Sequence, residues 1–250
     1  MNSLIVFAKT PRAGHVKTRL LKNTPLSEDE VCALYRAFLC DVLTAAGKSE
    51  ADRIIVNYLP ADGEAEMAEL VKGRISAQKL VLTPQSGENF TERVQNSFND
   101  AVSSGAEPVM MIGSDSPTLQ PKTINNAFTL LRKNGGVVLG PSGEGGLYLI
   151  GLMSGYLPDF SKIFGGSTEL LNFIREVDVV NLPIFLLEEL TDVDVASDLV
   201  SLISIIAAMR SAKHYGGTLF PENSAMMIDE LKIGVERKNG TRDKFVVRNR

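Results

Sequence analysis

Short apolar runs recur along the first 190 residues, and they are separated by longer segments in which apolar residues repeat with helical spacing. A short, continuously apolar run bounded by polar residues is typical of a strand that is covered on both faces of a sheet. The sequence predicts seven such strands: Leu4–Ala8, Ile54–Tyr58, Lys79–Leu82, Val109–Ile112, Val137–Leu139, Leu147–Leu152 and Ile184–Leu187.

Helices are predicted between these strands. Ser27, with Glu30 three residues later, forms a capping-box pattern ahead of an apolar stripe, and Asn89 with Glu92 opens a second helix in the same way. The predicted buried face of that second helix consists of Phe90, Val94, Phe98 and Val102. Two further helices are predicted over Lys122–Lys133 and Ala196–Met209.

Strands that alternate with helices of this length predict an α/β fold with three α/β/α layers and a mostly parallel sheet. We expect residues 1–211 to form this domain and residues 212–250 to form an appendage. In the appendage, Lys232–Glu236 and Phe245–Arg248 flank Asn239-Gly240, a strong signal for a β-hairpin turn. The alternative is a frayed, solvent-exposed tail, and a hairpin is also a candidate for pairing two subunits in a homodimer.

Composition and charge narrow the classes of function. The formal net charge of −4 argues against bulk nucleic-acid binding, which depends on neutralising phosphates. No apolar stretch approaches the roughly 20 residues of a membrane span, and the N-terminal run lacks signal-peptide flanks, so we expect a cytoplasmic protein without membrane association. Cys32 and Cys40 are eight positions apart in a predicted helix, roughly 12 Å, which favours free thiols over a disulfide.

A basic loop follows the first predicted strand. Lys9, Arg12, Lys17 and Arg19 surround Gly14, and the first acidic residue of the chain is Glu28. Glycine lets backbone N–H groups approach an anion, and cations offset the charge of a polyphosphate. We interpret the loop as a phosphate site; the alternative is a solvated basic loop. It is not a Walker A motif, because Val16 stands where that motif requires glycine.

Carboxylates follow two other predicted strands. Asp115 comes directly after Val109–Ile112, where a carboxylate can hold Mg²⁺ or Mn²⁺. Asp192 and Asp194 would lie on one side of an extended segment, and we prefer Asp194 as the second ligand. Asp198 falls in the first turn of the last predicted helix, where it also complements the helix dipole.

A glycine-rich loop, 140–146, has Glu144 as its only ionisable residue. Such a loop permits close approach to a ligand, although a flexible turn between two strands explains its composition equally well. The sequence does not support a serine or cysteine nucleophile or a structural zinc site. It has only two histidines, His15 and His214, and neither lies in a sequence pattern of such a site.

Four blocks of sequence, taken together, resemble a known family. They are 7–20, 113–119, 139–152 and the segment with Asp192, Asp194 and Asp198, and they occur in the family's order over roughly residues 3–205. The chain resembles the GT-A-like nucleotide-diphospho-sugar transferases of the selenodomain-associated or arsenosugar-biosynthesis type, and more distantly the phospholactate guanylyltransferases. Glu144 and Leu147 stand where the family has Asp and Tyr, and Gly166 stands near the position of a family Trp.

The resemblance implies a role for each block. The nucleotide would be held by the first and second blocks, through Phe7, Ala8, Lys9, Arg12, Gly14, Lys17, Arg19 and Ser114. Asp115 and Asp194 would hold the Mg²⁺ or Mn²⁺, and Asp115 and Lys17 would be catalytic. The acceptor or sugar, an unidentified small molecule, would be bound by Gly140, Pro141, Glu144, Gly145 and Gly146.

The function expected from these features is metal-dependent glycosyl transfer from a nucleotide-diphosphate sugar. One alternative is nucleotidyl transfer, in which a nucleoside triphosphate releases pyrophosphate. A second alternative, motivated by the changes at Glu144, Leu147 and Gly166, is a nucleotide-binding module without catalysis.

Overall fold

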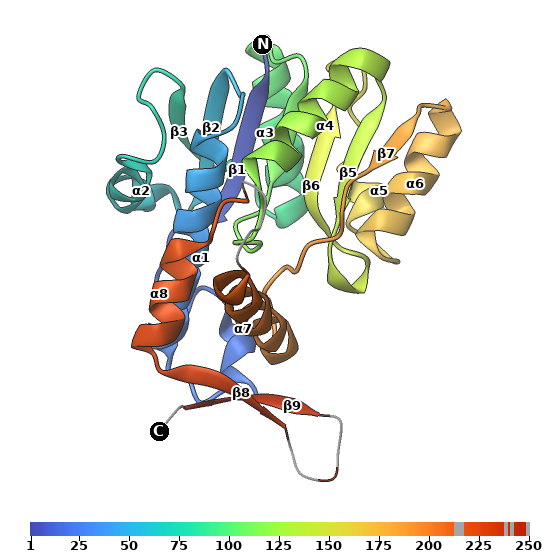
Figure 1. The fold of residues 1–250 in the computed structure, drawn as a ribbon. Helices are drawn as coiled ribbons and strands as arrows, with labels where there is room; N and C mark the ends of the chain where they lie inside the picture. Colours follow the sequence, from blue (N-terminus) through green and yellow to red (C-terminus); the bar gives the residue numbers. More distant parts are fainter. Residues whose placement is uncertain (213–217, 238–239, 241–242, 249–250) are drawn as a thin grey trace. The chain divides into compact units, whose positions relative to one another are not determined.

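The chain groups into two compact units (Figure 1). The computed structural model describes residues 1–212, 218–237, 240 and 243–248. The first unit contains residues 1–10, 43–114 and 119–190, and the second contains residues 11–42, 115–118 and the described part of 191–250. The predicted boundary between residues 211 and 212 stays a prediction.

A seven-stranded sheet organises the first unit (Figure 1). Its strands are β1 (Ser3–Lys9), β2 (Arg53–Leu59), β3 (Leu80–Pro84), β4 (Val109–Ile112), β5 (Val137–Pro141), β6 (Leu147–Leu152) and β7 (Ile184–Leu186). They are arranged in the order β3-β2-β1-β4-β6-β5-β7. Only β6 runs antiparallel to its neighbours, β4 and β5, whereas the remaining pairs are parallel. The predicted mostly parallel sheet is confirmed, and each predicted strand is present within two residues of its expected bounds.

Helices cover both faces of this sheet, as the buried strands require (Figure 1). On one face, α3 (Phe90–Ser103), α5 (Phe160–Ile163) and α6 (Glu169–Val180) share an apolar core with alternate strand residues. On the other, α2 (Glu64–Val71) contacts β3, and α4 (Pro121–Asn134) contacts β5 and β6. A short 3-10 turn, η2 (Ala61–Gly63), precedes α2. The predicted three-layer α/β/α class is therefore confirmed.

The second unit has its own apolar core. It contains η1 (Thr18–Leu21), most of α1 (Glu28–Gly47), α7 (Ala196–Ser211), α8 (Glu222–Glu230) and the antiparallel pair β8 (Ile233–Arg237) and β9 (Lys244–Arg248). Residues from all of these elements pack in one cluster, including Leu20, Phe38, Leu202, Ile228 and Val246. The predicted C-terminal hairpin is confirmed. In its turn, Gly240 has a φ of +80°, and Asn239 lies outside the described residues.

Local sequence signals explain where two of the helices begin. The backbone N–H of Ser27 donates to Glu30 Oε2 at 2.8 Å, and the N–H of Glu30 donates to Ser27 Oγ at 3.3 Å, which is the predicted capping box of α1. Asn89 Oδ1 accepts from the N–H of Glu92 at 3.0 Å at the start of α3. Cys32 and Cys40 are free, as predicted.

The prediction for the buried face of α3 is partly wrong. Val94 and Phe98 are buried, but the Phe90 side chain is 49% exposed. As the first residue of the helix, Phe90 lies with its ring edge-on against Phe7 and Phe164, at centroid distances of 5.8 Å and 4.8 Å.

Helices α2, α5, α6 and α8 were not predicted. None of the helices in the described residues combines the length and hydrophobicity needed to span a membrane.

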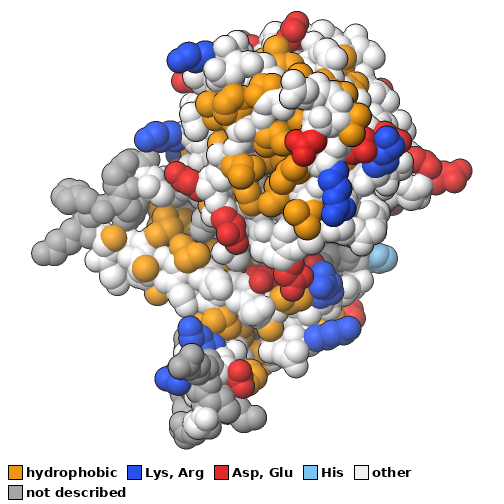
Figure 2. Space-filling view, turned by 90° about the vertical axis from the view of Figure 1, so that its right-hand side faces the viewer, with side chains coloured by type: hydrophobic (Ala, Val, Ile, Leu, Met, Phe, Trp, Pro, Cys, Tyr) orange, Lys and Arg blue, Asp and Glu red, His pale blue; other side chains and the backbone are white. Residues whose placement is uncertain are grey.

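Apolar side chains are also exposed on the face of the first unit that carries α6 and β7, which Figure 2 turns toward the viewer. The large exposed side chains on these two elements are Leu171, Val179, Val180 and Leu186. Strand β7 is an edge strand, paired only with β5.

Candidate functional site

The backbone of the basic loop directs the side chain of Lys17 inward. Lys17 has φ 48° and ψ 34°, a left-handed conformation that non-glycine residues rarely adopt, and it precedes η1. Val16 and Leu20, on either side of it, are buried, at 3% and 0% exposed, and Leu20 packs in the core of the second unit. Gly14, with φ +75°, supplies the preceding bend. The Lys17 side chain is only 6% exposed.

Asp115 and Asp194 come from segments that are joined by a backbone hydrogen bond. The N–H of Val193, which is fully buried, donates to the carbonyl oxygen of Asp115 at 2.9 Å. Asp198 Oδ2 accepts from the N–H groups of Asp194 and Val195, at 3.0 Å and 2.9 Å, and so satisfies donors at the start of α7. This capping fixes the backbone of Asp194 and gives Asp198 a structural role.

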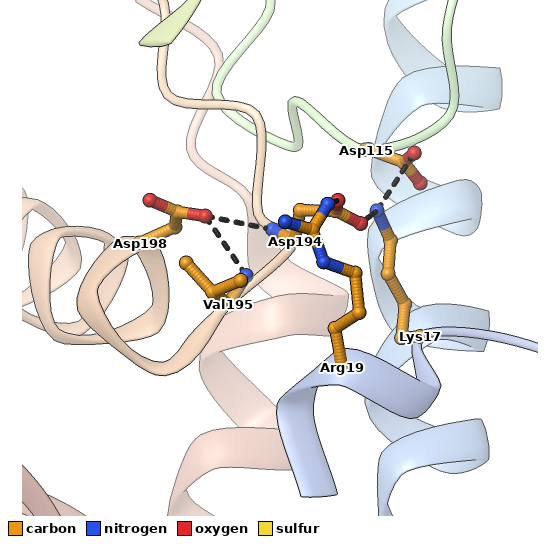
Figure 3. A network of polar contacts seen from close by, with 6 residues as sticks. All are labelled: Lys17, Arg19, Asp115, Asp194, Val195 and Asp198. Carbon is orange, nitrogen blue, oxygen red and sulfur yellow. Dashed lines mark hydrogen bonds and ion pairs between the residues drawn. The ribbon is translucent and has the colours of Figure 1, made fainter. Parts of the chain in front are cut away.

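One ammonium group lies between the two carboxylates (Figure 3). Lys17 Nζ is 2.7 Å from Asp115 Oδ2 and 3.1 Å from Asp194 Oδ1. Arg19 Nη1 contacts the other oxygen of Asp194, Oδ2, at 2.5 Å, and its side chain is 60% exposed. We call Lys17, Arg19, Asp115 and Asp194 the Lys17 cluster; all four belong to the second unit.

The charges in this cluster perturb one another. Burial acts against the Lys17 ammonium, but Asp115, Asp192 and Asp194 outweigh it and hold the pKa of Lys17 above its ordinary value. Burial likewise opposes the Asp194 carboxylate, yet Lys17 and Arg19 keep the pKa of Asp194 below its usual range. For Asp192, burial and the negative charge of Asp115 raise the pKa to about 7. Three acidic side chains, Asp115, Asp192 and Asp194, therefore act on the buried Lys17 ammonium.

The donor chemistry of the cluster suits a cation. Asp115 and Asp194 already converge on one positively charged atom, and carboxylate oxygens are the ligands that Mg²⁺ and Mn²⁺ prefer. Within the described part of the chain, no group of three His, Cys, Asp or Glu side chains is arranged to hold a metal ion. A divalent ion held by Asp115 and Asp194 would need further ligands from water or substrate, because ions such as Mg²⁺ and Ca²⁺ take roughly six or more oxygen ligands.

The other residues predicted to bind the nucleotide lie in β1, in the basic loop and after β4. In β1, Phe7 packs against Phe90, Ala8 is buried, and Lys9 is exposed at the end of the strand. Ser114, after β4, is 5% exposed, and Arg12 is half-buried in the basic loop. Their contribution to nucleotide binding stays a prediction.

Close packing explains why several positions of the loop at 140–146 are glycine. A Cβ on Gly140 would come within 2.5 Å of the Tyr148 ring, and one on Gly145, where φ is +78°, would come within 2.8 Å of Thr168. A Cβ on Gly146 would come within 2.7 Å of Ser142 Oγ. Pro141 ends β5, and Glu144, exposed at φ 58°, lies in the 3-10 turn η3 (Gly143–Gly145). The assignment of this loop to the acceptor stays a prediction.

Comparison with known protein families identifies the family of this chain. Residues 42–167, half of the chain, match a family described as "Uncharacterized protein conserved in bacteria (DUF2064)". The chain belongs to the DUF2064 family. The matched region of this DUF2064 protein includes Asp115 and the loop at 140–146, whereas Lys17 and Asp194 lie outside it.

Two solved structures are similar to this DUF2064 protein in fold. A candidate nucleotide-diphospho-sugar transferase from Desulfovibrio desulfuricans G20 is 27% identical, with a TM-score of 0.72 over 92% of this chain and 98% of that chain. A cytidylyltransferase from Leptospira borgpetersenii serovar Hardjo-bovis (strain JB197) is 11% identical, with a TM-score of 0.52 over 92% of this chain and 94% of that chain. No curated protein matches the sequence significantly. The expected resemblance to nucleotide-diphospho-sugar transferase-like proteins is confirmed.

Sequence reasoning missed a buried polar network at the ends of β1–β3. Gln85 Nε2 donates to the carbonyl oxygens of Ala8 and Asn57, both at 3.0 Å, and is itself buried. Asn57 Nδ2 donates to Thr83 Oγ1 at 3.1 Å, and Ser97 Oγ donates to Asn57 Oδ1 at 2.6 Å. Asn57, a polar residue within an otherwise apolar strand, could have indicated this network, because a buried amide requires hydrogen-bond partners.

Proposed function

We propose that this DUF2064 protein is a nucleotide-dependent transferase that transfers a glycosyl group from a nucleotide-diphosphate sugar to a small-molecule acceptor. The observation that carries the proposal is the convergence of Asp115 and Asp194 on one cationic atom beside a second cation, Arg19. The overall similarity to the Desulfovibrio desulfuricans protein, over nearly the full length of both chains, supports this class of reaction.

The chemistry of such a transfer explains why cations are needed. An acceptor oxygen forms a bond to the anomeric carbon while the bond from that carbon to the diphosphate oxygen breaks. The bonding electron pair leaves with the diphosphate, and the acceptor proton passes to solvent or to a base. Positive groups that face the leaving oxygens lower the barrier, since negative charge develops there in the transition state.

The described residues can meet this need in two ways. The Arg19 side chain is largely exposed, so its guanidinium is accessible to phosphate oxygens where it stands. Asp115 and Asp194 would hold a divalent ion, which would supply further positive charge to the diphosphate. Without such an ion, the Lys17 ammonium offsets part of the charge of the two carboxylates, and we assign Lys17 and Asp115 as the catalytic residues.

A turnover assay tests the proposal. Purified protein is incubated with UDP-, GDP- and ADP-sugars and Mn²⁺, and free nucleoside diphosphate is measured by chromatography. We expect release from at least one donor, and we expect Asp115→Asn to lower it by at least about 100-fold. The control is Asp178→Asn, which changes an exposed aspartate of α6 and should leave the rate within about twofold of the unchanged protein.

The same assay separates the alternatives. Release of pyrophosphate from a nucleoside triphosphate, with no turnover of any nucleotide sugar, would replace glycosyl transfer by nucleotidyl transfer, in which the cations face the α-phosphate. Mn²⁺-dependent thermal stabilisation by a nucleotide without turnover of either substrate class would indicate a non-catalytic binding module. Full activity of Asp115→Asn would remove that residue from the mechanism.

A further inference from the structure

The space between Asp115 and Asp194 is taken by the protein's own cation. Lys17 Nζ contacts one oxygen of each carboxylate, at 2.7 Å and 3.1 Å, and its side chain is almost completely buried (Figure 3). The proposed function gives the same two carboxylates to a divalent ion. An ion in contact with both of these oxygens would overlap with the ammonium group, because both cations need the same electron pairs and the same volume.

We propose that Lys17 is a built-in competitor of the divalent cation, so that the ion enters the Lys17 cluster only by displacing the ammonium. This inference rests on the proposed use of a divalent ion by the transferase. Displacement leaves the Lys17 ammonium without its carboxylate partners, and a negatively charged phosphate group is then its natural partner. Lys17 thereby couples entry of the ion to binding of the nucleotide diphosphate.

The local fold holds the backbone of Lys17 in place but allows its ammonium group to leave the two carboxylates. The left-handed backbone of Lys17 is anchored by the buried side chains of Val16 and Leu20, so the position of its Cα is fixed. The ammonium stands at the end of a flexible four-carbon stem, which can change rotamer without moving that backbone. Asp194 is retained in place independently, by the hydrogen bond from its N–H to Asp198 and by Arg19.

Mn²⁺ binding, measured without nucleotide or turnover, tests the competition. Free Mn²⁺ is followed by electron paramagnetic resonance while Mn²⁺ is titrated into the unchanged protein, Lys17→Met and Arg19→Met. We expect Lys17→Met to bind Mn²⁺ at least about fivefold more tightly than the unchanged protein. Arg19→Met removes one positive charge beside Asp194 but leaves the Lys17 contacts, so its gain should stay below about twofold.

Two outcomes of this titration overturn the inference. One is a Lys17→Met variant that binds Mn²⁺ no more tightly than the unchanged protein. The other is an equal gain in Lys17→Met and Arg19→Met, which would show an effect of net charge instead of occupancy. As a control for the site of binding, Asp115→Asn added to Lys17→Met should abolish the gain.

A labelling experiment on the unchanged protein keeps the inference testable if Lys17→Met does not fold. An amine-reactive ester is applied with and without saturating Mn²⁺, and the acylation of Lys17 is compared with that of the exposed Lys133 by peptide mass spectrometry. We expect Lys17 to be protected without Mn²⁺ and to react several-fold faster with it, at an unchanged rate for Lys133. An unchanged or slower reaction of Lys17 overturns the inference. If no nucleotide sugar is turned over in the turnover assay, the proposed function is wrong, but the results of the Mn²⁺ titration and the labelling experiment still decide whether Lys17 competes with the ion.

Discussion

Replacing Lys17 with methionine removes the cation that Asp115 and Asp194 share and keeps most of the apolar stem. Removing one partner of a fully buried ion pair costs about 3–5 kcal/mol, because a charge is left without compensation. Here the carboxylate side chains are 29% and 40% exposed, so water can solvate part of the released charge. We therefore expect Lys17→Met to lower the free energy of unfolding by about 2 kcal/mol.

A double-mutant cycle assigns this loss to the contact itself. Urea denaturation is measured for the unchanged protein, Lys17→Met, Asp115→Asn and the double variant. Because Asp115→Asn removes the charge that the lysine neutralises, we expect a coupling free energy of about 1.5 kcal/mol. The matched pair of Lys17→Met with Asp178→Asn should be additive within about 0.5 kcal/mol. A coupling below about 0.5 kcal/mol for Lys17 and Asp115 would refute the ion pair and the reasoning built on it.

Three further predictions concern the framework around the cluster, each measured by urea denaturation. Gly140→Ala should lower the free energy of unfolding by about 2 kcal/mol, because the added Cβ displaces the buried Tyr148 ring. Asp41→Ala should cost about 2–3 kcal/mol, because the Asp41 carboxylate accepts four hydrogen bonds from the first turn of α8. Glu30→Gln should cost about 0.5–1 kcal/mol at pH 7, since it breaks the ion pair with Arg248. Hydrogen bonds from Arg248 hold the pKa of Glu30 below its ordinary value, so this difference should be complete above that ordinary pKa and shrink as the pH falls through the lowered one.

Each of these predictions has a distinct counter-result. A stable Gly140→Ala protein would mean that this glycine serves a ligand and not the packing of Tyr148. Retention of full stability by Asp41→Ala would show that α8 is held by its apolar contacts alone. A Glu30→Gln effect that stays constant from pH 7 to pH 3 would show that it does not come from the ion pair with Arg248.

The sheet was largely predictable because its strands are buried on both faces. In β4 all four residues are buried, and an apolar run this short has the length of a strand and is too short for a typical helix. The helices were less predictable where polar and apolar positions mix. In α6, Leu171 and Val179 are exposed although apolar, which blurs the helical pattern that Phe173 and Val177 would otherwise give. Phe90 was placed in the core by spacing, but at the first position of α3 its ring packs on Phe7 and Phe164 and stays half-exposed.

The candidate site shows where sequence spacing stops being informative. The positions of Asp115 and Asp194 after strands and before a helix were sufficient to pair them in advance. The location of Lys17 between them was not, because it depends on a left-handed backbone angle that no motif in the loop specifies. The sequence favours Asp194 over Asp192 as a ligand, and in the structure burial and the charge of Asp115 raise the pKa of Asp192. Such effects arise from packing among distant segments, and sequence alone does not reveal them.

The most direct test of the central claim is a crystal structure of the protein with Mn²⁺ and a nucleoside diphosphate, analysed by anomalous diffraction at the manganese edge. We expect a manganese peak in contact with the carboxylates of Asp115 and Asp194 and with a diphosphate oxygen, and Lys17 Nζ turned from the carboxylates toward phosphate. A manganese–diphosphate complex bound elsewhere, with Lys17 Nζ still bridging Asp115 and Asp194, would contradict it.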